Sequence, residues 1–316
     1  MALLTPLAFD DACGLARSYG VELATLEPLA LGSVNSNFRA TARDGRVLFA
    51  RLYEEQDGAG AAAEVALAAD LARAAIPVTE ALPRSGPLPL HAGKPFVVFP
   101  WIDGEILCLA RVTEDACHKL GRALAAVHVA SLALPRLGPG RFRPLDMRQR
   151  LAEVERSVTR PGLLDHVHEV QFLYEHWEKQ RALDLPSGVV HGDLFRDNVL
   201  WKDGEIAALL DFESAFHGPF AYDLMVTIAA WCYRDAFELT LVRALFDGYT
   251  SVRPLTDAER RALPVEGALG CLRFATSRIT DFELRTPEGQ RPARDFRRFI
   301  ARLDAIVSGQ LSSVLG

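Results

Sequence analysis

The pattern of apolar residues changes abruptly at Pro100–Gly104, and this change constrains the fold more than any other feature of the chain. Before it, short apolar runs separated by Gly, Pro and Asp are typical of strands. After it, long segments with apolar residues every three or four positions are typical of packed helices. The sequence therefore predicts an α+β protein of two lobes, with an N-terminal lobe over 1–99, a hinge over 100–104 and a mostly helical C-terminal lobe over 105–316.

The N-terminal lobe is predicted to begin with a helix over residues 5–20. A five-stranded antiparallel sheet with one further helix is expected to follow. An Asp44-Gly45 turn joins two of the strands. The alanine-rich run over 58–75 has strong helix propensity, and Ile76-Pro77 ends it. The strands are expected over residues 25–31, 37–43 and 46–53, around 78–82, and over 95–100.

The C-terminal lobe is predicted to contain helices at roughly 113–131, 145–159 and 164–184, with further helices toward the C-terminus. Short apolar runs at 188–190, 199–201 and 206–211 interrupt them, and Asp203-Gly204 favours a hairpin between the last two runs.

Composition excludes several classes of protein. The formal net charge is −6 and the sequence pI is about 5.8, which argues against a main role in wrapping nucleic acid or binding an anionic membrane. The five cysteines form no C-x-x-C pair, and neither a signal peptide nor an apolar run of about 20 residues is evident. We expect a soluble cytoplasmic protein whose oligomeric state stays open.

The stretch HGDLFRDNVLWKDGEIAALLDFE, residues 191–213, carries the chemistry. If the hairpin around Asp203-Gly204 forms, Asn198 and Asp211 lie side by side at its open end. Their amide and carboxylate oxygens suit Mg²⁺, while Asp193 is free to accept the proton of an attacking hydroxyl. The order of these residues matches the catalytic loop and metal-binding segment of kinase-like folds.

The alternative is that these side chains only shape turns, since Asp and Asn favour loops. We interpret His191 as structural support for the loop. Asp223, in AYDL, is predicted to be a loop anchor that accepts backbone N–H bonds.

A kinase also needs a phosphate-covering loop and a cation in the first lobe. The loop is expected between the first two strands, where Ser33, Asn35 and Ser36 offer donors although Gly32 is its only glycine. No lysine precedes Lys94, so Arg51 is the candidate cation, and Glu64 is its natural partner. An ordinary turn and a solvent-facing arginine are the plainer alternatives.

Together, HGDLFRDN, LLDFE and AYDL resemble the aminoglycoside phosphotransferase-like, or choline kinase-like, small-molecule kinases. A narrower resemblance, to the homoserine kinases of that fold, rests on four segments: NSNF at 35–38, AWCY, residues 248–265 and residues 272–282. The resemblance implies a bilobal protein kinase-like fold and transfer of the γ-phosphoryl group of ATP, with Mg²⁺, to the side-chain hydroxyl of L-homoserine, a step toward threonine.

The resemblance also implies roles for individual residues. Asp193 is the catalytic base, Asn198 and Asp211 hold Mg²⁺, and the backbone of Pro100, Trp101 and Ile102 receives adenine.

Three positions depart from the pattern. Arg196 stands where these homoserine kinases usually have proline, Glu213 stands where they tend to have tyrosine, and Arg51 replaces the usual lysine. The first two lie near the expected substrate side and put homoserine itself, though not phosphoryl transfer, in question.

An amino-acid substrate needs a cation for its carboxylate and an acid for its ammonium group. Arg273, Arg278 and Asp281 fall on one expected helix, and the last two share a face. We assign Arg278 and Asp281 to the substrate, together with Asn37, Arg196 and Glu213; an ion pair on a solvated surface is the alternative.

Other functions remain to be weighed. Another hydroxylated metabolite or an aminoglycoside could be the acceptor. The arginine in place of lysine and the glycine-poor loop would also suit a nucleotide-binding pseudoenzyme, and His191 with Asp193 could serve a metal-dependent hydrolase. A protein kinase is disfavoured, because a helix is expected soon after Glu213 and no A-P-E signature follows.

Overall fold

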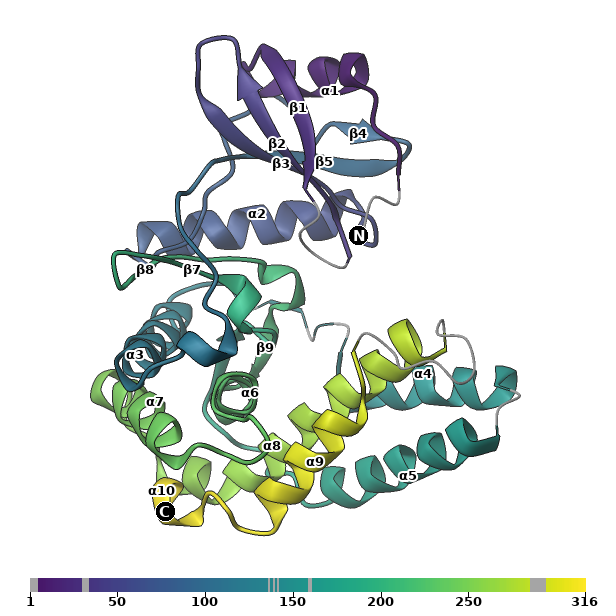
Figure 1. Ribbon diagram of the computed structural model, residues 1–316, viewed down its shortest axis with the longest axis vertical. Coiled ribbons are helices and arrows are strands. Elements are labelled where there is room, and N and C mark those ends of the chain that lie inside the picture. Colours follow the sequence, from purple (N-terminus) through teal and green to yellow (C-terminus); the bar gives the residue numbers. More distant parts are fainter. Residues whose placement is uncertain are drawn as a thin grey trace. The chain divides into compact units, whose positions relative to one another are not determined.

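The computed structural model of the chain describes residues 5–29, 34–135, 137–138, 140, 142–158, 161–284 and 294–316. The chain divides into two compact units. The first unit comprises residues 1–105 and 200–213, and the second comprises 106–199 and 214–316. Each unit has its own set of packed elements (Figure 1).

The first unit is built on a five-stranded antiparallel sheet of order β1-β2-β3-β5-β4. Asp44 and Gly45 turn the chain between the second and third strands, with Gly45 at φ +88. The five strands are β1 (Leu23–Leu29), β2 (Ser36–Ala42), β3 (Val47–Leu52), β4 (Leu90–His91) and β5 (Lys94–Pro100). The predicted five-stranded antiparallel sheet is therefore confirmed.

One of the predicted strands was wrong. The segment around 78–82 forms no strand, only an isolated bridge between Val78 and Leu209, and the edge of the sheet is instead the short β4. Pro77 and Pro83 flank the segment, and proline cannot donate to a ladder of backbone hydrogen bonds. Only isolated bonds remain, such as Leu82 N–H to the Val98 oxygen at 2.8 Å.

Helices α1 (Phe9–Ala16) and α2 (Gly58–Arg73) cover opposite faces of this sheet (Figure 1). Successive residues of a strand point to opposite faces. On β5, Phe96 and Val98 share a core with α1, whereas Val97 packs with Ala61 of α2. The first helix is shorter than predicted, because a 3₁₀ turn over Arg17–Tyr19 follows it.

The hairpin of β7 (Val199–Lys202) and β8 (Glu205–Leu209) belongs to the first unit. Its turn residues Asp203 and Gly204 have φ values of 52° and 78°, as expected for an Asp-Gly hairpin turn. Trp201 exchanges two backbone hydrogen bonds with Glu105, at 2.8 and 2.9 Å. The lobe boundaries predicted from the sequence, at residues 99–105, assign this hairpin to the C-terminal lobe. In the structure its backbone is hydrogen-bonded to Glu105 of the first unit.

The second unit is mostly helical, with a two-stranded sheet of β6 (Ser187–Val190) and β9 (Phe216–Pro219). Helix α6 is buried along its whole length. Helices α5, α6 and α9 all pack on α8. The helices are α3 (Glu114–Ser131), α4 (Pro144–Ser157), α5 (Pro161–Glu178), α6 (Phe220–Trp231), α7 (Leu239–Val252), α8 (Asp257–Arg278), α9 (Arg297–Val307) and α10 (Ser312–Leu315), and a π-helical turn, Ile279–Glu283, extends α8.

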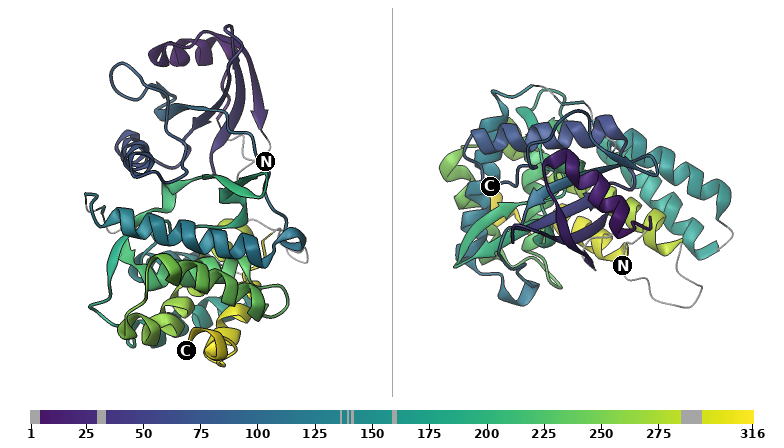
Figure 2. Two further views of the ribbon diagram at one scale, coloured as in Figure 1. Left: turned by 90° about the vertical axis from the view of Figure 1, so that its left-hand side faces the viewer. Right: turned by 90° about the horizontal axis from the view of Figure 1, so that it is seen from above.

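Helices α3 and α7 lie side by side (Figure 2). A methyl group on Gly121 would lie 2.1 Å from the Leu245 carbonyl oxygen, and one on Gly248 would lie 2.1 Å from the His118 oxygen. The two backbones therefore approach at a distance that only glycine permits.

The predicted helices over 113–131, 145–159 and 164–184 correspond to α3, α4 and α5, and the α+β class is confirmed. In the described part of the chain, no helix is both long and apolar enough to span a membrane.

Candidate active site

The loop between β6 and β7 carries the HGDLFRDN motif. The backbone oxygen of Asp193 accepts hydrogen bonds from the Phe195 N–H at 2.7 Å and from Asn198 Nδ2 at 2.8 Å. The Asp193 side chain is 32% exposed. The loop thus fixes the backbone of Asp193 and leaves its carboxylate accessible.

Asp223, on the buried helix α6, holds the start of this loop. Its carboxylate accepts the His191 N–H at 2.7 Å and the Gly192 N–H at 2.8 Å, which is the geometry of the predicted anchor. Gly192 has φ +73, a backbone conformation that favours glycine. Burial alone would raise the pKa of Asp223, but the hydrogen bonds from His128 and from the loop backbone outweigh it and hold this pKa below its usual value.

His128, on α3, continues the hydrogen-bonded chain away from the loop. Its Nε2 lies 3.0 Å from the Asp223 carboxylate and its Nδ1 lies 2.7 Å from the Tyr249 hydroxyl. An ionised carboxylate only accepts, so Nε2 carries the proton and Nδ1 accepts from tyrosine. Burial lowers the pKa of His128, which keeps the imidazole neutral.

Arg273, on α8, is the cation at Asp193. Its Nη1 lies 3.4 Å from Asp193 Oδ1 and its Nη2 donates to Ser214 Oγ at 3.3 Å. The guanidinium stacks on the rings of Phe142 and Phe274, at 4.2 and 3.9 Å from their centroids. A buried cation therefore stands directly beside the predicted base.

In the first unit, Arg51 and Glu64, predicted to pair, lie 3.8 Å apart. Arg51 also approaches Asp211 Oδ1 at 3.4 Å, and its Nε donates to Asn37 Oδ1 at 3.1 Å. Burial alone would lower the pKa of Arg51, but its acidic neighbours, Asp211 foremost, raise it. Burial raises the pKa of Glu64 above its usual value, with Asp211 adding to the rise and Arg51 opposing it.

The side chains predicted for the phosphate-covering loop lie at the start of β2 and are buried. Asn35 donates to Glu213 at 2.6 Å and accepts the Glu54 N–H at 3.0 Å. Ser36 donates to the Glu54 carboxylate, which Lys94 also contacts. These polar groups form a bonded network within the first unit, and Ser33 lies outside the described residues.

Asp211 and Asn198 have donors that fit Mg²⁺. Asp211 follows β8 with a left-handed backbone, φ 63°, which is uncommon for a residue other than glycine. Its side chain is 31% exposed. Asn198 uses its amide nitrogen on the Asp193 oxygen, which leaves the amide oxygen as the atom able to bind a cation. Carboxylate and amide oxygens are hard donors of the kind that Mg²⁺ takes.

Within the described ranges, no group of three or more His, Cys, Asp and Glu side chains is arranged to hold a metal ion. One carboxylate and one amide do not make such a group.

The predicted hinge residues continue from the end of β5. Pro100 is the last residue of that strand, and the Trp101 N–H donates to the Val47 oxygen at 3.3 Å. The guanidinium of Arg39 lies 5.5 Å from the centre of the Trp101 ring. Ile102 is partly exposed.

The residues predicted for the substrate fall in different places. Arg196 donates to the Ala230 oxygen at 2.6 Å, at the end of α6. Arg278 donates to the Asp295 oxygen at 2.8 Å, and burial together with neighbouring arginines lowers its pKa to about 9. Asp281 lies in the π-helical turn and accepts from Thr280. Of the arginines weighed on this helix, Arg273 is the one that contacts Asp193.

Sequence reasoning missed His128 and passed over Arg273. The signal for His128 was present, since a lone histidine in the apolar run LAAVHVAS is expected to be buried and to need polar partners. For Arg273 the sequence offers only its helix, and the fold alone brings residue 273 to residue 193.

Comparison with known sequences gives a consistent result. A model of the phosphotransferase enzyme family matches residues 25–255. A homoserine kinase of Rhizobium rhizogenes is 35% identical over 299 residues, covering 92% of this chain and 90% of the relative. A homoserine kinase of Agrobacterium fabrum is 33% identical over 304 residues, with the same two coverages of 92% and 90%.

Solved structures share the fold at lower identity. An amicoumacin kinase in complex with AMP-PNP and Ca²⁺ is similar with a TM-score of 0.71 and 16% identity, covering 96% of this chain and 94% of that one. A choline/ethanolamine kinase family protein of Mesorhizobium loti has a TM-score of 0.64 and 20% identity, covering 97% of both chains.

Proposed function

The chain belongs to the phosphotransferase enzyme family, and from that premise we propose that it phosphorylates L-homoserine with Mg²⁺-ATP to give O-phospho-L-homoserine. The family resemblance read from the motifs is confirmed, and the chain is a small-molecule phosphotransferase that acts on a hydroxyl group. The observation that carries homoserine is the 35% identity to a homoserine kinase across nine-tenths of both chains.

In the proposed reaction Asp193 is the base. The substrate hydroxyl oxygen bonds to the γ-phosphorus of ATP while the bond from that phosphorus to the bridging oxygen breaks. ADP leaves with the bridging oxygen, and the hydroxyl proton passes to the Asp193 carboxylate. The exposed carboxylate on a fixed backbone supports this role, because a base must reach the hydroxyl without moving the loop.

The nucleotide is assigned to the first unit. Arg51, held by Glu64, is proposed to contact the phosphates; Asn35, Ser36 and Ser33 stay in the proposal as the covering loop, and Pro100, Trp101 and Ile102 as the adenine segment. Asn198 and Asp211 would hold Mg²⁺, which supplies positive charge for the phosphate oxygens. The buried ion pair supports the assignment of Arg51, since it orients the guanidinium before nucleotide arrives.

A different acceptor is the second candidate. Arg196 and Glu213 differ from the residues usual in homoserine kinases, and an antibiotic kinase shares the fold. Both side chains have partners inside the protein, Ala230 and Asn35 respectively, which supports structural rather than substrate-selecting roles for them. Homoserine therefore remains the first choice.

A cytoplasmic setting belongs to the same proposal. The structure has five free cysteines, of which Cys117, Cys232 and Cys271 are buried. Reduced thiols of this kind suit a reducing compartment.

Release of ADP by the purified protein with Mg²⁺-ATP tests the substrate. We expect turnover with L-homoserine and little with L-serine, choline or kanamycin. Turnover with one of those three instead would reassign the acceptor, and nucleotide binding without transfer to any of the four would favour a pseudoenzyme.

Replacement of the base tests the mechanism. Asp193→Asn is expected to lower kcat by at least about 100-fold, in the range for a lost general base, because the amide cannot take the hydroxyl proton. Affinity for Mg²⁺-ATP, measured by calorimetry, should stay within a few-fold of wild type. Wild-type turnover in this variant would show that another group is the base.

A further inference from the structure

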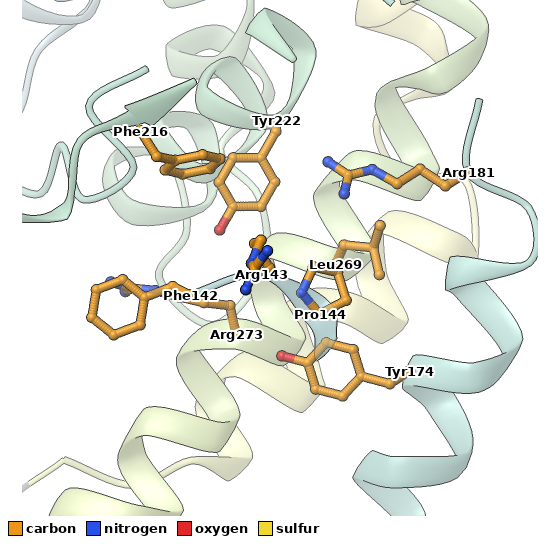
Figure 3. A pocket seen from close by; sticks show the side chains of 9 residues that line it. All are labelled: Phe142, Arg143, Pro144, Tyr174, Arg181, Phe216, Tyr222, Leu269 and Arg273. Carbon is orange, nitrogen blue, oxygen red and sulfur yellow. The ribbon is translucent and has the colours of Figure 1, made fainter. Parts of the chain in front are cut away.

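Figure 3 shows a small pocket in the second unit, and one of its lining residues, Arg273, contacts the predicted base Asp193. Its cavity is about 30 Å³ and is lined by Phe142, Arg143, Tyr174, Arg181, Tyr222 and Arg273, among others. A cavity of this size holds about two water molecules, which is close to the size of a carboxylate group. The hydroxyl groups of Tyr174 and Tyr222 point toward the same space in Figure 3. The pocket thus combines positive charge with hydroxyl donors in a space that fits a small anion.

Of the three arginines that line the pocket, two have carboxylates as close partners. Arg181 makes two hydrogen bonds to Glu266, both at 2.8 Å, and Arg143 makes two to Asp146, at 2.8 and 2.9 Å. Arg273 differs, because among the described residues its ion pair is a longer contact of 3.4 Å between Nη1 and Asp193 Oδ1. A guanidinium can bind a carboxylate through two parallel hydrogen bonds, and this geometry is used at Arg181 and Arg143 but not at Arg273.

The surroundings of Arg273 hold it in place for a ligand. The side chain is 7% exposed, and stacking on Phe142 and Phe274 fixes the plane of the guanidinium. A planar cation fixed by aromatic rings loses little conformational freedom when it binds a planar anion. Arg273 lines the pocket and also contacts the Asp193 carboxylate. An anion bound to Arg273 in the pocket therefore lies close to the proposed base.

We propose that Arg273 binds the carboxylate of the acceptor and so makes the enzyme selective for hydroxy acids. The proposal rests on the phosphotransfer function above and assigns the recognition end of that site. The carboxylate enters the cavity and pairs with the guanidinium, and the hydroxyl at the other end of a short carbon chain reaches Asp193. The site therefore takes a small hydroxylated amino acid or hydroxy acid.

The charge of the pocket also works against other acceptors. Arg143 and Arg181 are paired with Asp146 and Glu266, so a cationic acceptor without a carboxylate would place its charge beside the guanidinium of Arg273. Choline and the aminoglycosides are cations without a carboxylate. The same residue that favours an acid therefore disfavours these compounds.

The test compares two acceptors that differ in the carboxylate alone. 3-Amino-1-propanol has the hydroxyl and amine of homoserine but no carboxylate. We expect wild type to prefer L-homoserine in kcat/KM, and Arg273→Gln to raise KM for homoserine by roughly 10- to 100-fold, as for a lost charge-assisted hydrogen-bond pair. Values for 3-amino-1-propanol, which has no carboxylate to lose, should stay the same or improve as the like charge is removed, so the preference collapses.

Two variants serve as controls. Arg273→Lys keeps the charge without the planar fork and is expected to recover part of the homoserine KM. Arg260→Gln removes another arginine of α8, which bonds to the Leu315 oxygen at 3.3 Å, and is expected to keep the preference. Thermal unfolding of each variant confirms that it is folded.

A kcat loss with unchanged KM for both acceptors would overturn the proposal, because Arg273 would then act only by positioning Asp193. Loss of the preference in Arg260→Gln but not in Arg273→Gln would also overturn it.

A binding measurement separates this proposal from the proposed function. L-2-Aminobutyrate has the carboxylate and amine of homoserine but no hydroxyl, so it binds without reacting. Calorimetry should detect it with wild type and find at least about 10-fold weaker binding with Arg273→Gln. This result would stand even if no acceptor were phosphorylated. Equal binding by both proteins, or none by wild type, would overturn the role of Arg273.

Discussion

At the scale of residues, a buried chain of hydrogen bonds connects α7 to the loop that carries the proposed base Asp193. Arg253 donates to the Tyr249 hydroxyl, which bonds to His128, and His128 bonds to Asp223. Asp223 in turn accepts two backbone N–H groups of the loop. A neutral histidine can serve both neighbours at once, whereas a protonated one would present a second donor to the tyrosine oxygen. The loop is therefore best held when His128 is neutral.

This arrangement predicts an acid-sensitive stability. Burial lowers the pKa of His128, so its contribution to stability is complete above the unfolded pKa near 6.5 and falls as pH drops toward the folded value. The surrounding groups are Asp223, Tyr249, Arg253 and Glu259. Asp223 keeps its charge in this window because its own pKa is lowered.

The measurement is the free energy of unfolding in urea at pH 7.5, 6.5 and 5.5. Wild type should lose stability between the last two values, by no more than about 1.4 kcal/mol per pH unit for one proton. His128→Gln, which has no proton to gain, should show a smaller loss. Parallel pH profiles for the two proteins would assign the acid sensitivity to another group.

Arg51 predicts a graded response to substitution. Arg51→Lys keeps a positive charge opposite Glu64 and Asp211 but loses the Nε bond to Asn37. We expect KM for ATP to rise several-fold with kcat within about 10-fold of wild type, whereas Arg51→Met should lose about 100-fold or more in kcat/KM. Steady-state kinetics with varied ATP measure both. Equal, near-wild-type kinetics would place Arg51 away from the phosphates.

Sequence reasoning reached some of these residues and not others for a physical reason. The pairing of Arg51 with Glu64 could be predicted from the sequence. The two residues lie on consecutive elements, and the sequence offers few alternatives nearby. The contact between Arg273 and Asp193 joins positions 80 apart, and its existence depends on how α8 packs. Local spacing carries no information about such a contact.

At the scale of elements, the crossing of α3 and α7 depends on two glycines. A side chain at Gly248 would meet the His118 carbonyl oxygen, which is backbone and cannot rotate away. Gly248→Ala is therefore expected to lower the free energy of unfolding by about 1–3 kcal/mol or more. Gly162→Ala, on α5 with no atom within 4 Å of the added carbon, should change it by less than about 1 kcal/mol.

Urea unfolding followed by circular dichroism measures both glycine variants. If they are equally stable, the helices have room to separate and the close approach is not a requirement of the fold.

Helices were easier to predict than strands in this chain. A helix can be predicted from its own apolar spacing and capping residues. An example is Thr113, whose hydroxyl accepts the Ala116 N–H at the start of α3. A strand exists only if a partner is available. The segment around 78–82 has the composition of a strand, yet β4 forms the edge of the sheet. Strand β4 is only a few residues from β5 in the sequence, so the two pair in a hairpin. Which of the two segments joins the sheet depends on strand pairing, and the sequence pattern of a single segment does not show its pairing partner.

At the scale of the whole molecule, nucleotide is expected to stabilise the fold. A ligand at 100 times its Kd adds about 2.7 kcal/mol to the free energy of unfolding. A non-hydrolysable ATP analogue with Mg²⁺ should therefore raise the melting temperature by several degrees. Removal of Mg²⁺ with EDTA should reduce the shift, and Asp211→Asn should reduce it also, while Asp193→Asn should retain it. An equal shift in Asp211→Asn would remove Asp211 from the proposed Mg²⁺ ligands.

The first unit takes its hairpin from residues 200–213, far along the chain from residues 1–105. During synthesis, residues 1–105 leave the ribosome before the partners of Glu105 and of the Pro77 oxygen exist. At about 5–20 residues per second, making residues 106–199 takes roughly 5–20 seconds. For that time the five strands of the sheet are complete, but the backbone groups of Glu105 and the Pro77 oxygen lack their hairpin partners, so the nascent first unit passes through an interval in which a chaperone could bind it.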